Sequence, residues 1–372
     1  MPAPGTILID RARPPARAAL TDTSTLFLVG PTASGTVEEP TKLRDITDYT
    51  NAFGARTGAG IPTYDYLDAF FREYGGTVWF AKLSALSTKY EDALIKFTDE
   101  LGPGQVAAIG AETAAAHSKV LAHAQALNRH ALLDCAQTDV AAATLEGIAT
   151  TDSADPNASY GEVLGPWATI PPIPGGSVRH VPYSAIQAAI LSRNDKAGVV
   201  QNQPSAGVWG ISTYALDVAA AYTDAERSAL NAAGVNVARL KNGTVRTYGA
   251  RTVAPATDAY TLASNSRLRM AIFAQADVIA ESYVFAQIDG RRVKVNEYGA
   301  QLSALLARFY EAGALYGDTA REAFRVDVGP TVNTDATIAA NELHAVMLCR
   351  MSPFAELVQI DLVKVAITDT VA

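Results

Sequence analysis

The sequence predicts an α/β core with a mostly parallel sheet, a C-terminal α+β domain, and extended strand arms at both chain ends. Three observations support this fold class. Continuous apolar runs alternate with helical patterns in the first two thirds of the chain, later helices carry one-sided apolar stripes, and both ends hold short strand patterns. The expected parts are residues 1–20, 21–252, 253–355 and 356–372.

The N-terminal arm, residues 1–20, contains one short strand signal at Thr6–Ile9. The prolines Pro14 and Pro15 that follow it are incompatible with a helix interior. A single short strand cannot stabilise itself, so its apolar residues must pair with another sheet. We therefore expect Ile7, Leu8 and Ile9 to form a strand in a neighbouring molecule.

The core is predicted from buried-type strands that alternate with amphipathic helices. The strand runs are Leu26–Val29, Val78–Leu83, Val106–Ile109, Ala131–Leu133 and Val235–Leu240, and the helical patterns are Tyr64–Tyr74, Glu112–Asn128 and Val140–Ile148. Continuous apolar strands between helices are typical of a parallel sheet that is covered on both faces. Residues 151–182 are rich in Pro, Gly and Ser, which predicts a long surface loop around one short strand.

Two local signals end this part of the chain. Thr223 and Glu226 have the spacing of a capping box, and Gly234 is a suitable stop for the helix that begins there. Asn242-Gly243 predicts a type I′ turn, because that turn needs positive φ at both central residues. The resulting hairpin is expected to lead out of the α/β core.

The C-terminal domain, residues 253–355, is predicted to hold two helices and two strands. Apolar residues recur at helical spacing in 265–284 and 301–313, and strand patterns follow at Phe324–Val328 and Leu343–Met351. The odd positions of the second strand are apolar, and Pro353 ends it. The C-terminal arm, residues 356–372, has an alternating pattern that changes phase.

In that arm the apolar face is first the even one and then the odd one, over Val358, Ile360, Leu362, Val363, Val365 and Ile367. Such a change of phase indicates a bulge, a crossing between sheets, or burial on both faces. For a chain end, a crossing from one molecule to the next is an attractive interpretation. These six residues are therefore candidates for strand exchange between subunits.

Composition excludes several function classes. The chain has 372 residues, 18% charged residues and a net charge of −8, which argues against nucleic acid as a partner. The low charged fraction instead suggests extensive burial against copies of the same chain. No apolar stretch is long enough to span a membrane, and the N-terminal sequence lacks the pattern of a secretory signal. Cys135 and Cys349 are expected to be buried thiols, although sequence alone leaves a disulfide open.

The sequence predicts no cofactor, no metal and no catalytic residue. Gly30–Thr36 follows a strand and has glycine spacing like a phosphate-binding loop, but the lysine is missing. His117, His123 and His130 do not share a helix face, so exposed helix histidines are expected rather than a metal cluster. Asp134 ends a strand, where it either caps a turn or serves as an enzyme carboxylate.

Two further residue groups have ordinary structural explanations available. Arg193 and Asp195 are expected to form a structural ion pair and loop hydrogen bonds. The tryptophans Trp167 and Trp209 lie in Gly/Pro-rich segments, where they either pack against the core or form a contact surface between subunits.

An ordered series of short motifs runs from Ser159 to Thr252. It comprises Ser159-Tyr160, Pro166-Trp167, Val181-Pro182-Tyr183-Ser184, Arg193 to Val199, Asn202 to Gly210, Leu230 to Asn236, and Tyr248-Gly249-Ala250-Arg251-Thr252. Similar motifs occur at Thr25–Gly30, Phe70–Phe80 and Ser352–Glu356. In this order the chain resembles the contractile tail sheath proteins of bacteriophages and phage-tail-like particles. Departures are Tyr183 before Ser184, Gln187-Ala188-Ala189 in place of Ala-Gly, and Tyr248 in place of Trp.

The resemblance implies a structural subunit that forms stacked hexameric rings around an inner tail tube, on a baseplate and beneath a tail terminator. Subunits would rearrange as nearly rigid bodies and drive the tube through the host envelope without spending a nucleotide. The implied location is the virion tail, after assembly in the host cytoplasm. The family's C-terminal domain generally faces the tube, which makes Arg308, Glu311, Arg321 and Arg325 candidate tube contacts. Alternatives are a cytoplasmic α/β enzyme with an unrecognised site, and a non-contractile tail or shell protein.

Overall fold

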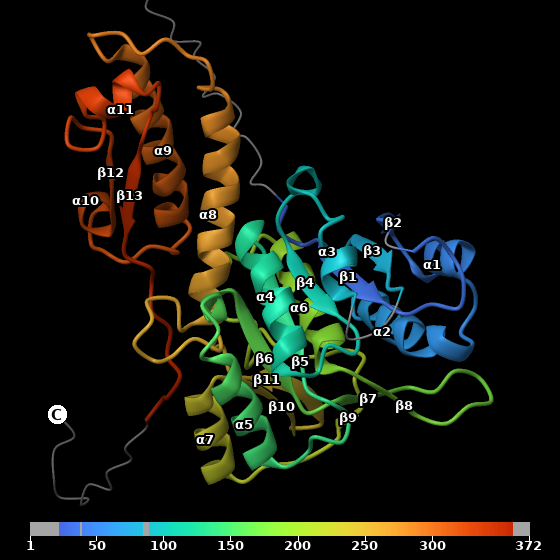
Figure 1. The fold of residues 1–372 in the computed structure, drawn as a ribbon. Helices are drawn as coiled ribbons and strands as arrows, with labels where there is room; N and C mark the ends of the chain where they lie inside the picture. Colours follow the sequence, from blue (N-terminus) through green and yellow to red (C-terminus); the bar gives the residue numbers. More distant parts are fainter. Residues whose placement is uncertain (1–21, 38, 85–88, 360–372) are drawn as a thin grey trace, which may run out of the picture.

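A mostly parallel, eight-stranded sheet forms the centre of the protein (Figure 1). The computed structural model describes residues 22–37, 39–84 and 89–359. In spatial order the strands are β11 (Thr244–Tyr248), β10 (Val235–Lys241), β6 (Gly161–Gly165), β5 (His130–Asp134), β4 (Gln105–Ala108), β1 (Leu26–Gly30), β3 (Val78–Lys82) and β2 (Thr41–Leu43). Only β2 and β11 run antiparallel to their neighbours. The predicted mostly parallel α/β sheet is therefore present.

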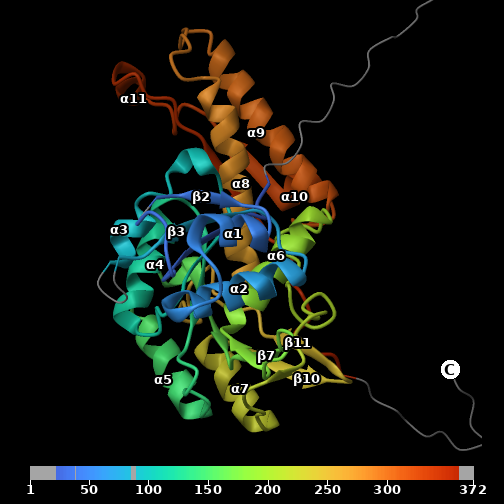
Figure 2. The ribbon, with the colours of Figure 1, turned by 90° about the vertical axis from the view of Figure 1, so that its right-hand side faces the viewer.

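Helices cover both faces of the sheet. One face carries α1 (Ile46–Phe53), α2 (Ile61–Arg72) and α6 (Tyr183–Lys196), and the other carries α3 (Tyr90–Leu94), α4 (Ala114–Ala126), α5 (Ala142–Asp152) and α7 (Asp224–Ala233). In Figure 2, α4 and α5 lie on the left and α6 on the right. Strand β1 illustrates the two cores, because Leu26 and Leu28 pack on one side and Phe27 and Val29 on the other.

The predicted capping box and turn both occur in the structure. Thr223 and Glu226 exchange the two capping hydrogen bonds at the start of α7, and Gly234 ends the helix with φ 92°. Asn242 and Gly243 have φ values of 53° and 76°, as a type I′ turn requires. The expectation that this hairpin leaves the core is wrong, because β10 pairs with β6 and the hairpin completes the main sheet.

Residues 151–182 do not form the predicted surface loop around one short strand. They contain the buried central strand β6 and two strands of a small sheet, β7 (Ala168–Ile170) and β8 (Arg179–Val181), which is completed by β9 (Asp217–Val218). Glycine at position 161 is a packing requirement here, since a Cβ would lie 2.6 Å from Leu121 and 2.9 Å from Ala131. At position 161 the glycine therefore marks close packing within a strand rather than a loop.

Helix α6 is absent from the sequence-based expectations for a related reason. Eleven of its fourteen residues are buried, among them Ser184, Gln187, Ser192 and Asn194. A helix that is covered on all sides has no polar stripe, so it shows no helical periodicity.

The third core lies at the C-terminal end of the chain. It is formed by α8 (Ala263–Glu281), α9 (Val293–Glu311), α10 (Ala320–Ala323) and the hairpin of β12 (Phe324–Asp327) and β13 (Val346–Cys349), with α11 (Asp335–Ala339) between the two strands. The two predicted helices and two predicted strands are present, although the strands are shorter. Figure 1 shows α8 extending from the end of the main sheet to this unit, alongside α9.

Candidate assembly surface

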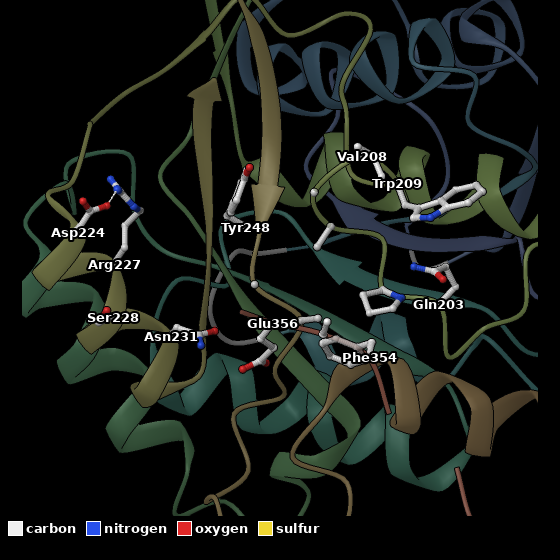
Figure 3. Close-up of a pocket in the computed structure, with 16 residues that line it drawn as sticks. Gln203, Val208, Trp209, Asp224, Arg227, Ser228, Asn231, Tyr248, Phe354 and Glu356 are labelled. Atoms are coloured by element: carbon white, nitrogen blue, oxygen red, sulfur yellow. Dashed lines mark hydrogen bonds and ion pairs between the residues drawn. The ribbon is translucent and has the colours of Figure 1, made fainter. Parts of the chain in front are cut away.

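The segment after β13 returns to the main sheet and forms one wall of a groove beside its β11 edge. The groove has a volume of about 730 Å³. Its walls are α7, the loop 203–209, the end of β11 and the segment itself. The lining residues are Gln203, Pro204, Ala206, Gly207, Val208, Trp209, Asp224, Arg227, Ser228, Asn231, Tyr248, Gly249, Ala250, Phe354, Ala355 and Glu356. Figure 3 shows Phe354 and Glu356 beside side chains from α7 and from this loop.

An ion pair attaches this segment to the sheet. The guanidinium of Arg251 donates to the Glu356 carboxylate at 2.8 Å. Arg251 is itself held by Asn236, whose side chain accepts from the Arg251 amide and donates to its carbonyl oxygen, both at 2.8 Å. Two of the sequence motifs, which are about a hundred residues apart, therefore meet at one point. The sequence shows both motifs but gives no signal that they are in contact.

Glycine at position 249 allows this arrangement. Its φ is 151°, and a Cβ there would lie 2.6 Å from the Asn236 amide oxygen and 2.8 Å from the Asn236 Cα. A side chain would therefore displace Asn236, and with it the support of Arg251.

The outer edge of β11 is covered by main chain from the loop that follows α6. Gly207 donates to Thr247 at 2.8 Å, Thr247 donates to Gly210 at 3.1 Å, and Ser212 donates to Val245 at 2.9 Å. The apolar side chains of Val208 and Trp209 on this loop are 72% and 44% exposed. The groove thus combines a covered sheet edge with exposed apolar surface.

Most candidate strand-exchange residues lie outside the described residues. These are Ile7, Leu8 and Ile9 at the N-terminal end, and Ile360, Leu362, Val363, Val365 and Ile367 at the C-terminal end. Val358 is described, and both it and Leu357 are largely exposed, at 75% and 83%. The C-terminal segment therefore leaves the groove with apolar side chains facing solvent.

The four candidate tube contacts lie on three neighbouring elements of the third core. Arg308, which is half-buried, and Glu311, which is exposed, belong to the last turn of α9. Arg321 is exposed on α10, and Arg325 is exposed on β12, where it pairs with Asp327 at 3.1 Å. The apolar residues Phe324 and Val326 of β12 face the opposite way, toward the core, so Arg325 points outward.

The expected pairing of Arg193 with Asp195 is wrong. Arg193 pairs with the buried Glu73 at 2.6 Å, and Asp195 pairs with Arg267 of α8 at 2.6 Å. Residues two apart on a helix point to different sides, which explains why each finds its own partner.

The Glu73 carboxylate also holds the loop after α6. It accepts from the amides of Thr213 and Tyr214 at 2.8–2.9 Å and from the Ser212 hydroxyl at 2.7 Å. Both members of the supposed pair thus connect distant parts of the fold.

Asp134 acts as a buried cap. It is fully enclosed at the end of β5 and accepts from the Ser184 amide at 3.0 Å and from the Ser184 hydroxyl. That amide belongs to the first turn of α6, where helix amides lack internal partners. Burial raises the pKa of Asp134 to about 7. The capping interpretation of Asp134 accounts for all of these contacts.

The histidines are not the exposed helix residues that the sequence suggested. His117 and His130 are fully buried, and His123 is half-buried. His117 Nδ1 lies 2.6 Å from Asp152, and Nε2 lies 3.0 Å from the carbonyl oxygens of Ala111 and Asp134. Burial lowers the pKa of His117, but the hydrogen bond and charge of Asp152 outweigh it, so the net pKa is raised.

Other sequence candidates have structural positions. Trp167 donates its indole N–H to the carbonyl oxygen of the buried Cys135 at 2.7 Å, whereas Trp209 lines the groove. Gly30–Thr36 forms the connection from β1 toward the edge strand β2, and the first helix after it begins only at Ile46. Both cysteines are free, with Cys135 buried and Cys349 half-buried.

The described residues hold neither a candidate metal cluster nor a candidate membrane span. Among residues 22–37, 39–84 and 89–359, no group of three or more His, Cys, Asp or Glu side chains is placed to hold a metal ion. No helix within those ranges has the length and apolar character needed to cross a membrane.

Comparison with solved structures identifies the fold. The chain resembles the contracted helical sheath of the anti-feeding prophage, with a TM-score of 0.74, 20% identity, and coverage of 98% of this chain and 99% of that one. The fold is that of the contractile sheath proteins. The contracted PVC sheath complex of an extracellular contractile injection system gives a TM-score of 0.74 at 16% identity over 98% of both chains.

A sheath tail protein from Desulfitobacterium hafniense is more distant. Its TM-score is 0.59 at 10% identity, over 87% of this chain and 93% of that one. By sequence, the chain matches no family model and no curated protein. The sheath fold is therefore recognised through the three-dimensional structure, and it extends over almost the whole chain.

Proposed function

We propose that this protein is the subunit of a contractile tail sheath, with a structural rather than an enzymatic role. The supporting observation is the match over 98% of the chain to the sheath of the anti-feeding prophage and to the PVC sheath complex. The motif series from Ser159 to Thr252 supports the same conclusion independently. The partners are other copies of the chain in stacked hexameric rings, an inner tail tube, a baseplate and a tail terminator. The sheath is assembled in the host cytoplasm and belongs to the tail of a phage or phage-like particle.

In this proposal the two terminal arms connect the subunits. Strand addition uses main-chain hydrogen bonds, which do not depend on the side chains of the partner surface. Such links persist while the contacts between neighbouring subunits change during contraction. The exposure of Leu357 and Val358, where the chain leaves the groove, supports a C-terminal arm that reaches away from its own core.

The tube contact is proposed for the charged surface of the third core. Arg308, Glu311, Arg321 and Arg325 provide polar contacts, which suit an interface that must form in the extended sheath and release on contraction. The domain boundaries at residues 20, 252 and 355 are proposed as the limits of the parts that move relative to one another.

Electron microscopy of the chain, alone and with its tube protein, tests the proposal. Rings or tubes of sheath diameter are expected, and tube protein should become coated along its length. Monodisperse globular particles at all concentrations would instead favour the enzyme alternative. Thin tubes that never change length would favour a non-contractile tail or shell protein.

A further inference from the structure

A polar interface joins the first half of α8 to the core. The Ser266 hydroxyl donates to the Ser159 carbonyl at 2.7 Å, and Arg269 donates to the same oxygen at 3.1 Å. Arg267 forms its ion pair with Asp195 here. Polar groups, rather than a dry apolar contact, therefore line this junction.

Several buried polar atoms at this junction have no hydrogen-bond partner among the described protein atoms. In α8 they are the Ser264 hydroxyl, the Asn265 side-chain oxygen, and Nε of Arg267 and of Arg269; across from α8 they include Oε1 of Gln201. Buried polar groups are normally paired with protein or with ordered water. Their concentration in two turns of one helix points to a shared cause.

Ser264, Arg267 and Gln201 line the same small cavity, together with Glu162. The space open to the centre of a water molecule is about 10 Å³. That volume is close to the minimum for one water, and a buried water typically makes about three hydrogen bonds. The size of the cavity and the number of unpaired atoms therefore agree.

We propose that this cavity binds one structural water molecule that bridges α8 to the core. Arg267 Nε–H donates to it, the water donates to Gln201 Oε1, and the Ser264 hydroxyl takes either role. A neutral ligand fits better than an ion, because an arginine and a glutamate both line the cavity. The bridge adds to the Arg267–Asp195 pair and joins α8 to the segment after α6.

Two alanine variants give opposite expectations. Ser264→Ala removes one partner of the water, so its melting temperature should fall by roughly 1–2 °C for a chain of this length. Ser192→Ala is the matched control, because its hydroxyl is also buried and unpaired on a helix but lines no part of this cavity. Removing that hydroxyl should leave the melting temperature unchanged or raise it.

Water relaxation supplies a second readout. Oxygen-17 relaxation dispersion of the purified chain should show one fewer long-lived water in Ser264→Ala than in the wild type, and no change in Ser192→Ala. A dry cavity would leave the serine hydroxyl unpaired, so Ser264→Ala would then raise the melting temperature. That rise, or an unchanged count of long-lived waters, would overturn the proposal.

Discussion

Arg267 of α8 and Asp195 of α6 form an ion pair of 2.6 Å in which each side chain is only 3% exposed. The same carboxylate accepts from the Thr23 hydroxyl at 2.7 Å, and Gln201 donates to that hydroxyl at 3.1 Å. The pair thus connects the beginning of the described chain, a core helix and the helix that carries the third core. Breaking this pair therefore tests how strongly α8, and with it the third core, is held to the main-sheet core.

Asp195→Asn should destabilise the protein strongly, because it leaves the Arg267 guanidinium buried without its counter-charge. The expected loss is about 3–5 kcal/mol in the free energy of unfolding, measured by urea denaturation. Asp327→Asn breaks the exposed pair with Arg325 and serves as the control, with an expected cost of less than about 1 kcal/mol. Equal effects of the two variants would contradict the importance of burial at Asp195.

The raised pKa of His117 predicts that the protein loses stability as the pH rises through the neutral-to-alkaline range. Its pKa is raised above 6.5 in the folded state, so protonation stabilises the fold fully below pH 6.5 and the benefit disappears as pH rises through the folded pKa. The groups around it are Asp152, Glu112 and the Asp134 carboxyl. Because the pKa of Asp134 is raised to about 7, its contribution to stability also falls as the pH rises from about 4 to 7.

Comparison with a variant isolates the histidine. The stability difference between the wild type and His117→Gln should shrink as the pH rises from 6.5 through the folded-state pKa of His117, with a slope of at most about 1.4 kcal/mol per pH unit. A proton NMR titration of His117 reports its pKa directly. A pKa at or below 6.5, or a difference that does not change with pH, would contradict this account.

The Arg251–Glu356 pair predicts a charge-swap result. Glu356→Lys should release the C-terminal segment from the groove, at a cost below about 1 kcal/mol because the pair is partly exposed. Limited proteolysis near residues 352–359 should become faster, while the melting temperature changes little. The double variant Arg251→Glu, Glu356→Lys should restore protection. If the double variant is cleaved as fast as the single one, the ion pair does not hold the segment.

The terminal arms predict defects of assembly without defects of folding. Ile7→Pro removes a backbone donor and costs about 3 kcal/mol if that strand is paired. Sheath formation should fail while the melting temperature of the isolated subunit stays the same. Deletion of residues 363–372 should give a folded subunit, by circular dichroism, that no longer forms long tubes. A global loss of structure after either change would mean that the arm belongs to its own core.

The tube contact is tested by reversing two charges. Arg321→Glu combined with Arg325→Glu should weaken co-assembly with the tube protein and leave sheath-only polymers intact, because both side chains are exposed. Co-sedimentation at physiological salt measures this. The double variant Lys42→Glu, Arg44→Glu changes two exposed residues on and just after β2, at the opposite edge of the main sheet from β11, and should coat tubes normally. Normal coating by the Arg321/Arg325 variant as well would place the tube-facing surface elsewhere.

Local signals in the sequence correctly predicted several elements. The capping box at Thr223 and the Asn242-Gly243 turn depend on hydrogen bonds and φ values within a few residues, so neighbouring residues decide them. The apolar runs of β1, β3, β4, β5 and β10 predicted the parallel sheet, because strands buried on both faces are continuously apolar. The ordered motifs also indicated the sheath fold that the solved structures share.

Tertiary contacts decided the rest. Helix α6 and strand β6 are enclosed by other elements, so neither carries the one-sided polar pattern that sequence reasoning detects. The partners of Arg193, Asp195 and His117 lie between 35 and 120 residues away in sequence. The sequence by itself determined the local elements and the fold class. Packing between distant segments determined the ion pairs, the polar interface of α8 and the groove at Glu356, because no local pattern encodes which distant residues come together.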